Sequence, residues 1–405
     1  MLQLLNDRES GVGDPRSLLK AHRTARSHLI ELSKYRDVQQ NHTAGINSLQ
    51  LDQVERRYLL SGGADGQISI FDIDHTSPTP EKTYKSIKNV KRGHRFAHTK
   101  SVSRVSWYPI DTGMFVTSGT DKCLKIWDTN QMKPAEKLDL DWLIYSHDMS
   151  PTSVLHSLVA VSGQHSKIVL VDLRTGSKTH TLKGHNGRVY CVRWSPKDDF
   201  ILASGSEDNR VMFWDVRKSK GHIMVLDQHN GDSSATPQSV NTAHSGHVNG
   251  LEFTADGLHL VTTGTDHRLR LWETGGGKNL LVNYGKIQND SKKCIQFAIS
   301  EFCDPDLIYI PQNADIEVFN MISGEHVQTL TGHFNQVNCL VYNGDYQELY
   351  SGANDRNILV FSPNTEMEAV YKDHVDSMRK AQSGRAVSGY VKRIGTADAW
   401  SSDED

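Results

Sequence analysis

Several features that would assign this chain to common functional classes are missing from its 405 residues. No stretch approaches the roughly 18 consecutive apolar residues that a membrane-spanning helix needs, and the first residues lack the long apolar core of a secretion signal. We therefore expect no membrane association. The five cysteines are odd in number and never form a Cys-x-x-Cys pair. Such usage is typical of a reducing compartment and argues against a cysteine-based zinc site.

The chain also lacks an excess of either charge. Its 45 Lys and Arg residues are balanced by 48 Asp and Glu residues, giving a net charge of -3. A protein that binds DNA regardless of sequence needs a basic surplus to neutralise phosphates. We therefore do not expect direct DNA contact to be the main role. Apolar residues make up 37% of the chain, which permits a sizeable folded core.

What the sequence does contain is a repeat, built on a His, an Asp and an aromatic residue. In five units the Asp follows the His after 22 or 23 residues, and the aromatic residue follows the Asp after six. Two further units are degraded: one runs from His147 to Asp172, and one ends at Phe319. Seven units are a common number for a β-propeller. The five regular units contain His42, Asp65 and Phe71; His98, Asp121 and Trp127; His185, Asp208 and Trp214; His244, Asp266 and Trp272; and His333, Asp355 and Phe361.

Within each unit the residue pattern is that of short β-strands. One unit shows β-branched and aromatic runs at Val189–Trp194, Phe200–Ser204, Arg210–Trp214 and Ile223–Leu226, separated by Gly, Pro, Asp and Asn. A sheet of four short strands cannot bury both of its faces alone, so the sheets must stack around an axis and close. The sequence therefore predicts an all-β fold, a seven-bladed propeller over residues 37–363.

The repeat resembles the WD-repeat family. The resemblance implies a buried relay in which a Ser or Thr, four residues before the Asp, joins the His and the Trp by hydrogen bonds. Such a relay satisfies polar groups that would cost about 1–3 kcal/mol each if buried unpaired. Phe71 and Phe361 replace Trp in the first and last units, whose relays should be weaker. The complete relays are His98, Thr117, Asp121 and Trp127; His185, Ser204, Asp208 and Trp214; and His244, Thr262, Asp266 and Trp272.

Signatures of catalysis and cofactor binding are missing. The chain has no Gly-x-Ser-x-Gly, His-Glu-x-x-His or kinase motif, and its glycine clusters at 61–66 and 275–278 lack the strand–glycine–helix context of a phosphate loop. Two histidine pairs have metal-like spacing, His94 with His98 and His244 with His247, but each pair shares a residue with a relay. We expect no catalytic residue, no metal and no cofactor.

The segment DPRSLLKAHRTARSHLIELSKYR, at 14–36, predicts an amphipathic helix ahead of the propeller. Asp14 suits the N-cap and Pro15 the first helical turn, and leucines recur at helical spacing. Such a helix could pack on its own propeller or dock into a groove of a partner. We favour docking, because a closed ring leaves few free edges to cover. Residues 1–36 are accordingly predicted to be a separate docking segment.

Two consecutive units end in VDLR (171–174) and WDVR (214–217). These resemble the paired WDxR signature of substrate receptors of cullin-RING ubiquitin ligases, in which the Arg projects towards the damaged-DNA-binding adaptor. The planar guanidinium suits bidentate contacts with carbonyls and carboxylates. Val171 departs from the signature, so Arg174 fits it less well than Arg217. The residues assigned to adaptor binding are Leu18, Leu19, Leu29, Ile30, Leu32, Arg174 and Arg217.

The resemblance extends over the whole chain. YPIDTGMF (108–115), LDQHNG (226–231), LVNYGK (281–286) and DAWSSDED (398–405), together with the N-terminal segment, resemble the Cockayne syndrome A family of WD-repeat receptors. The resemblance implies a nuclear, non-catalytic subunit of a cullin-four RING ubiquitin ligase in transcription-coupled nucleotide excision repair. Implied partners are the damaged-DNA-binding adaptor, the cullin-RING core, Cockayne syndrome B protein and repair factors associated with RNA polymerase II.

The target-binding side is expected on the opposite, upper rim. Its candidates are the basic residues in the connections that contain the relay histidines: Lys100, Arg188, Lys292 and Lys293. Residues 364–405 are polar and acidic at the end, which predicts a disordered tail. There, Trp400, Ser401 and Ser402 form a docking motif or a merely solvated end. An alternative function is a WD-repeat scaffold of a chromatin or ribosome-assembly complex unrelated to ubiquitin.

Overall fold

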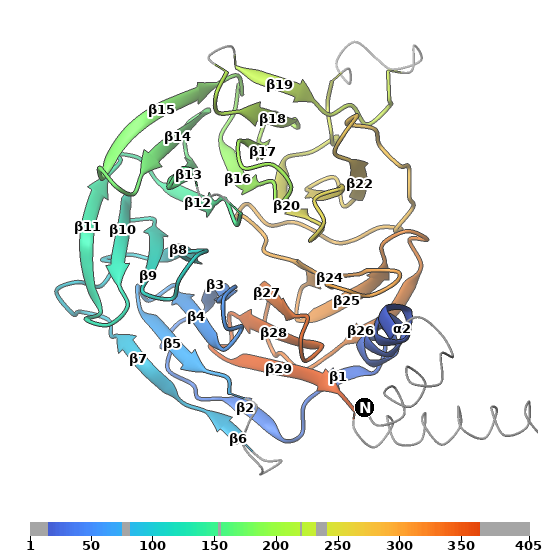
Figure 1. Cartoon of the computed structure of the whole chain (residues 1–405), viewed down its shortest axis with the longest axis horizontal. Helices are drawn as coiled ribbons and strands as arrows, with labels where there is room; N and C mark the ends of the chain where they lie inside the picture. Colours follow the sequence, from blue (N-terminus) through green and yellow to red (C-terminus); the bar gives the residue numbers. More distant parts are fainter. Residues whose placement is uncertain (1–14, 75–81, 153–154, 219–220, 232–240, 365–405) are drawn as a thin grey trace, which may run out of the picture.

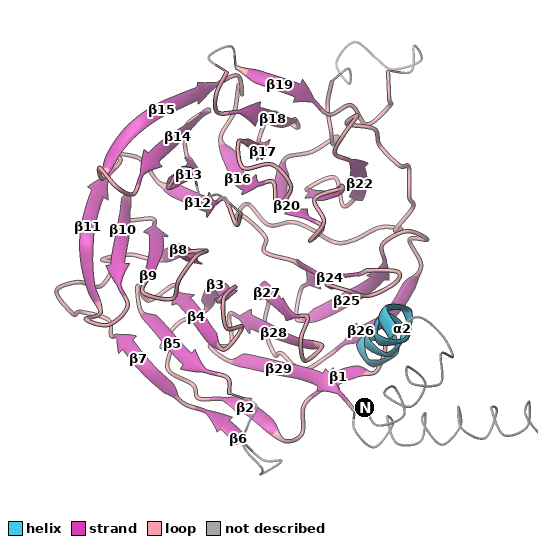
Figure 2. Ribbon diagram, viewed as in Figure 1, coloured by secondary structure: helices cyan, strands magenta, loops and turns pink. Residues whose placement is uncertain are grey.

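The computed structural model describes residues 15–74, 82–152, 155–218, 221–231 and 241–364. Over these ranges the strands form seven antiparallel sheets of three or four strands, which surround a central axis (Figure 1). Figure 2 shows that strands and connecting loops make up nearly all of the ring. Within the described residues the helix is α2 (Pro15–Ser27), which lies at the edge of the ring. The predicted all-β, seven-bladed propeller is confirmed.

The blades follow one another in chain order, and in each blade the first strand lies nearest the axis. Blade 1 consists of β3 (Ile46–Leu51), β4 (Tyr58–Gly63), β5 (Ile68–Asp72) and β7 (Ser86–Val90). Blade 2 consists of β8 (Val102–Trp107), β9 (Met114–Gly119), β10 (Cys123–Asp128) and β11 (Lys133–Asp139). Blade 3 consists of β12 (Ile144–Met149), β13 (Leu158–Gly163), β14 (Lys167–Asp172) and β15 (Ser177–Lys183). Blade 4 consists of β16 (Val189–Trp194), β17 (Ile201–Ser206), β18 (Val211–Asp215) and β19 (His222–Val225). Blade 5 consists of β20 (Val248–Phe253), β21 (His259–Gly264) and β22 (Leu269–Glu273). Blade 6 consists of β23 (Ala298–Ile299), β24 (Leu307–Gln312), β25 (Asp315–Asn320) and β26 (His326–Leu330). Blade 7 consists of β27 (Val337–Asn343), β28 (Glu348–Ala353), β29 (Ile358–Pro363) and β1 (Ile30–Leu32). A separate parallel pair joins β2 (Arg36–Val38) to β6 (Lys82–Tyr84).

The last blade is completed by the N-terminal part of the chain. Strand β1 pairs antiparallel with β29, with Ile30 opposite Pro363 and Leu32 opposite Phe361. The expectation of one continuous helix through residue 36 is therefore wrong, because α2 (Pro15–Ser27) ends nine residues earlier. An unpaired edge of β29 would leave backbone groups without partners, and β1 satisfies them. Ile30–Leu32 thus belongs to the propeller, and the boundary predicted at residue 36 is too late.

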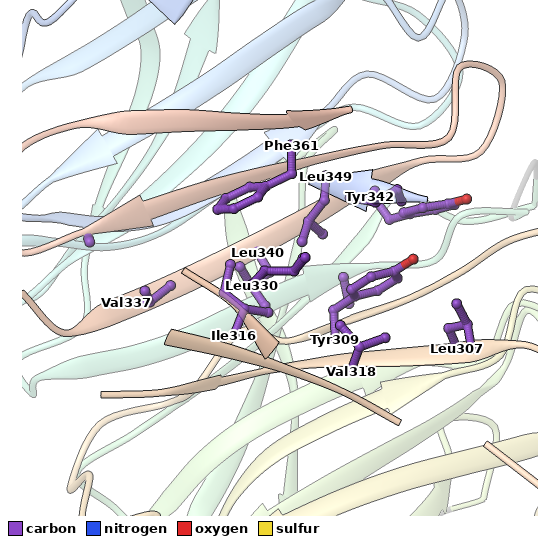
Figure 3. Packing of buried hydrophobic residues seen from close by; sticks show 13 residues of the cluster. Leu307, Tyr309, Ile316, Val318, Leu330, Val337, Leu340, Tyr342, Leu349 and Phe361 are labelled. Atoms are coloured by element: carbon purple, nitrogen blue, oxygen red, sulfur yellow. The ribbon is translucent and has the colours of Figure 1, made fainter. Parts of the chain in front are cut away.

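The hydrophobic core is distributed between neighbouring blades. Figure 3 shows the cluster between blades 6 and 7, where Tyr309 of β24 and Tyr342 of β27 stack with ring centroids 5.5 Å apart. Ile30 is 1% exposed and belongs to this same cluster, so it also cannot present its side chain to a partner in this arrangement. Stacked aromatic pairs add about 0.5–1.5 kcal/mol beyond their buried area. The junction that closes the ring is therefore well packed.

The chain direction defines two faces. We call the lower face the one that carries the connections from the first to the second strand and from the third to the fourth strand of each blade. The upper face carries the connections between blades and from the second to the third strand. Because β1 starts beside Pro363, at the end of a third strand, α2 lies on the lower face. Within the described residues, no helix is long and apolar enough to cross a membrane.

Candidate docking faces of the propeller

The three predicted Trp-containing relays form continuous chains of hydrogen bonds near the upper face. In blade 2, Nδ1 of His98 lies 3.0 Å from the carboxylate of Asp121, and Nε2 lies 2.7 Å from Oγ1 of Thr117. The indole of Trp127 donates to the same Oγ1 at 2.8 Å. The corresponding bonds in blades 4 and 5 are 2.7–3.1 Å long. Each relay ties the connection between blades to two strands of its sheet.

Charge in these relays resides on the aspartates. Burial lowers the pKa of the His98 imidazole, although its bond to Asp121 acts in the opposite direction. Burial would raise the pKa of Asp121, but the bond from His98 and two backbone amides together lower it. The same directions hold for His244 and Asp266. These contacts fit a neutral His whose Nδ1 donates to the Asp carboxylate and whose Nε2 accepts from the Ser or Thr hydroxyl. We interpret this arrangement of the relay as structural.

The relays of the first and last blades differ from each other. His333 contacts Asp355 at 2.8 Å and Ser351 at 2.6 Å, so the relay keeps its geometry although Phe361 supplies no indole. His42 contacts Ser61 at 2.7 Å, but its Nδ1 is 3.5 Å from Asp65 and has no hydrogen-bond partner in the described structure. Loss of the indole donor alone therefore does not loosen the His–Asp contact.

The two signature arginines lie on the lower face in different states. The fork of Arg217 is already bound within its own blade, because Nε and Nη2 each donate to a different oxygen of Asp215 at 2.9 Å. Its guanidinium also lies 4.4 Å from the ring centroid of Phe200. Arg174 is exposed, and only its backbone amide is bound, to Asp172. Arg217 is thus presented in one orientation, while the Arg174 side chain has no described partner to hold it.

Helix α2 packs with one face on the lower side of blades 6 and 7. Oγ of the fully buried Ser27 lies 2.8 Å from the hydroxyl of Tyr342. The backbone amide of Asp304 donates to Oγ1 of Thr24 at 2.8 Å, and Lys20 pairs with the Asp304 carboxylate at 2.9 Å. Leu19 on the helix is exposed. The helix therefore combines the two arrangements considered from the sequence: it packs on its own propeller and keeps an apolar residue at the surface.

The remaining leucines assigned to adaptor binding are placed differently. Leu29 is half-buried and Leu32 is exposed on β1. Leu18 lies within α2, but its side chain is outside the part that the structure describes, as are Trp400, Ser401 and Ser402 of the tail. The predicted leucine stripe is therefore divided between a helix and a strand.

Sequence reasoning missed a set of exposed apolar side chains on the lower face. In the described residues, six of the seven connections from first to second strand carry one, and Leu155, at 72% exposed, is the most accessible. Among the described connections of the upper face, the one between β26 and β27 carries Phe334, which is 93% exposed, and the one between β22 and β23 carries Leu281. Apolar residues in turns directly after an inner strand were the available signal. The six are Val54, Ile110, Leu155, Leu258, Phe302 and Tyr346.

The predicted basic residues lie on the upper face. Lys100 precedes β8, Arg188 precedes β16, and Lys292 and Lys293 precede β23, and all four are exposed. Arg188 lies 3.7 Å from the Glu207 carboxylate. The four come from three separate blades and do not form one cluster around a common point. Across the described part of the chain, no group of three or more His, Cys, Asp or Glu residues is arranged to hold a metal.

The chain matches the WD domain, G-beta repeat model over residues 33–72, 89–128, 176–215, 235–273 and 324–362. These matches end on the third strands of blades 1, 2, 4, 5 and 7, the blades with regular repeat spacing.

Three relatives illustrate how similarity is distributed. WD repeat-containing protein ATCSA-1 of Arabidopsis thaliana is 32% identical, covering 91% of this chain and 96% of that protein. Radiation-sensitive protein 28 of Saccharomyces cerevisiae is 22% identical over 68% of this chain and 60% of that protein. A ribosome biogenesis protein WDR12 homolog of Drosophila mojavensis is 26% identical over 46% of this chain and 44% of its own length. With its seven blades, its His–Ser/Thr–Trp relays and a relative similar over nearly the full length, the chain belongs to the WD-repeat family.

Proposed function

We propose that this protein is the substrate-recognition subunit of a cullin-four RING ubiquitin ligase that acts in transcription-coupled nucleotide excision repair. It joins the damaged-DNA-binding adaptor to Cockayne syndrome B protein and to repair factors at stalled RNA polymerase II in the nucleus. The full-length similarity to ATCSA-1 supports this assignment, since its name carries the CSA of the Cockayne syndrome A family. The name of the yeast relative, Radiation-sensitive protein 28, is compatible with a role in DNA damage.

The observation that carries the proposal is the difference between the two faces. Large exposed apolar side chains collect on the lower face, where Arg217 is held in place and α2 presents Leu19. An exposed apolar surface rimmed by polar residues is typical of a protein-binding face. Its extent around the ring suits a broad partner such as the adaptor. The upper face, with its dispersed basic residues and Phe334, remains available for the repair factors.

The chain itself supplies positioning. Ubiquitin transfer would take place on the RING partner and its conjugating enzyme, and the propeller would hold the target near them. The scaffold function in ribosome or chromatin assembly has weaker support, because the ribosome biogenesis relatives are 25–26% identical over 46–58% of this chain, compared with 32% over 91% for ATCSA-1.

Affinity purification of the full-length chain from nuclei tests the proposal. The variant Ile110→Asp/Leu155→Asp places two charges on the lower face, and Phe334→Asp is the matched control on the upper face. We expect the first variant to lose at least tenfold in recovered adaptor and cullin, and the control to recover them like the wild type. Recovery of the adaptor by the lower-face variant, or a wild type that recovers only chromatin or ribosome-assembly proteins, would contradict the proposal.

A further inference from the structure

A cavity of about 540 Å³ lies inside the ring and is lined by the lower ends of the inner strands. Trp107, Met149, Trp194, Phe253 and Ile299, each at or near the end of an inner strand, contribute to its wall. The connections that follow these strands also line it, so the cavity opens on the lower face. Its volume is many times the roughly 30 Å³ that one water molecule occupies in the liquid.

Most charges in this wall are paired. Arg193 lies between two carboxylates, 3.0 Å from Glu252 and 4.0 Å from Asp148. Nearer the mouth, Arg56 contacts Glu301 at 2.7 Å. The Asp52 carboxylate accepts backbone amides of its own loop, from residues 55, 56, 57 and 58. Each of these acids therefore already has a donor.

Arg104 is different. It lies on β8, is only 6% exposed and lines the cavity, yet its side chain makes no hydrogen bond or ion pair with any described residue. Its Nε is buried without a partner, and so are Oγ of Ser106 and Nε1 of Trp107 on the same strand. A buried guanidinium without a direct ion pair or hydrogen bond carries a desolvation cost of several kcal/mol. Asp148 and Glu252 attract Arg104 only from beyond ion-pair distance, because both carboxylates are bound to Arg193. The wall therefore holds one cation without a direct partner, with two further hydrogen-bonding groups on its strand.

We propose that this cavity binds a small oxyanion, such as inorganic phosphate, at Arg104. The guanidinium presents parallel N–H groups that match two oxygens of a tetrahedral anion. The Ser106 hydroxyl, two residues along the strand and therefore on the same side of it as Arg104, supplies a further donor. Because Arg104 is only 6% exposed, a bond to its guanidinium is stronger than one at the surface. The binding of the anion would also compensate the charge of Arg104. This inference does not depend on the proposed ligase function.

The test is a titration of the full-length protein with phosphate at constant ionic strength, maintained with chloride. We expect a saturable rise in the melting temperature of the wild type. Arg104→Gln should bind phosphate at least tenfold more weakly, while Arg92→Gln, which removes an exposed arginine in the connection between β7 and β8, should leave the affinity unchanged. The ³¹P line width of phosphate with wild-type protein gives a second readout, for which Arg104→Gln need not fold.

A wild type that shows neither a saturable melting response nor ³¹P broadening overturns the proposal. Equal responses in the wild type and in folded Arg104→Gln do the same, because the anion would then bind elsewhere. If sulfate, a second tetrahedral oxyanion, displaces phosphate and acetate does not, the tetrahedral match to the guanidinium is supported. Displacement by acetate at equal concentration would instead show that a tetrahedral anion is not preferred, against the proposed geometry.

Discussion

Ile30 pairs with Pro363, so the last sheet of the ring joins two segments that are 333 positions apart in the chain. The same residue is buried, together with Leu330, in the cluster that links blades 6 and 7. Strand pairing and packing therefore close the ring at one place. The short segment before residue 33 is therefore part of the last blade of the propeller.

The first prediction concerns that closure. Replacing a buried Ile by Ala typically costs about 2–5 kcal/mol, because contacts are lost and a cavity remains. We expect Ile30→Ala to lower the free energy of unfolding by an amount in this range. Leu32→Ala, two residues along the same strand but exposed, should cost less than about 1 kcal/mol. Chemical denaturation measures both, and equal losses would argue against a specific role for the buried side chain.

Truncation provides an independent test of the same strand. A chain that begins at residue 29 retains β1, and one that begins at residue 34 lacks it. We expect the longer form to melt cooperatively and the shorter form to melt at a clearly lower temperature. Similar melting temperatures would show that β29 does not require its partner.

The second prediction concerns the relays. Thr117 accepts the Trp127 indole and contacts His98, whereas Ser351 in the last blade contacts His333 without an indole. The nearly isosteric Thr117→Val would leave two buried polar groups unpaired and should cost about 2–4 kcal/mol. Ser351→Ala leaves one and should cost about 1–3 kcal/mol. Thermal or chemical denaturation of the two variants gives the comparison, and a larger loss for Ser351→Ala would contradict this account.

The third prediction is loss of stability in mild acid. The pKa values of His98 and His244 are lowered by burial, so the folded state takes up fewer protons than the unfolded state below the ordinary histidine pKa of about 6.5. The pKa values of Asp121, Asp208 and Asp266 are also lowered, which removes further stability as the pH falls below about 4. Stability should therefore be greatest near neutral pH and fall on acidification from about pH 6.5.

Melting temperatures between pH 5 and 8 measure this effect. In His98→Gln, one of the histidine contributions is removed, so the loss between pH 6.5 and pH 5 should be smaller than in the wild type. Substitution of the exposed His229 by Gln should leave the profile unchanged. A profile that is flat between pH 8 and 5, or that rises towards acid, would be inconsistent with the lowered histidine pKa values.

The fourth prediction separates stability from docking at Arg217. Its ion pair with Asp215 is more than half exposed on the arginine side, and exposed pairs usually contribute 0–1 kcal/mol. Arg217→Ala should therefore change the melting temperature little while reducing adaptor recovery, if the proposed function is right. Arg210→Ala, at the other face of the same blade, serves as the control. Reduced recovery that follows a large loss of stability would assign Arg217 a structural role instead.

The repeat spacing was sufficient to predict the number of blades, because His, Asp and Trp are required at fixed positions by one buried hydrogen-bond chain. Strand β16 begins and ends at the predicted residues, Val189 and Trp194. The N-terminal segment was predicted only in part: the helix begins at Pro15 as expected, but leucine spacing alone does not distinguish a longer helix from the short strand that pairs at Ile30. That distinction depends on the free edge of β29, more than 300 residues away.

Surface and cavity features were the least predictable. The bond between Arg217 and its own Asp215 depends on a turn geometry that the WDVR motif does not specify. Arg104 occupies an inner-strand position at which neighbouring blades have serine or cysteine, and its burial becomes evident only when the ring is assembled.

The short step from α2 to β1 has a mechanical consequence. Helix α2 ends at Ser27 and strand β1 starts at Ile30, so only two residues separate a helix at the surface from the strand that completes the last blade. Force applied to the helix by a moving complex would be passed almost directly to the β1–β29 ladder. There it would act along the strands and load the backbone hydrogen bonds between β1 and β29 in shear.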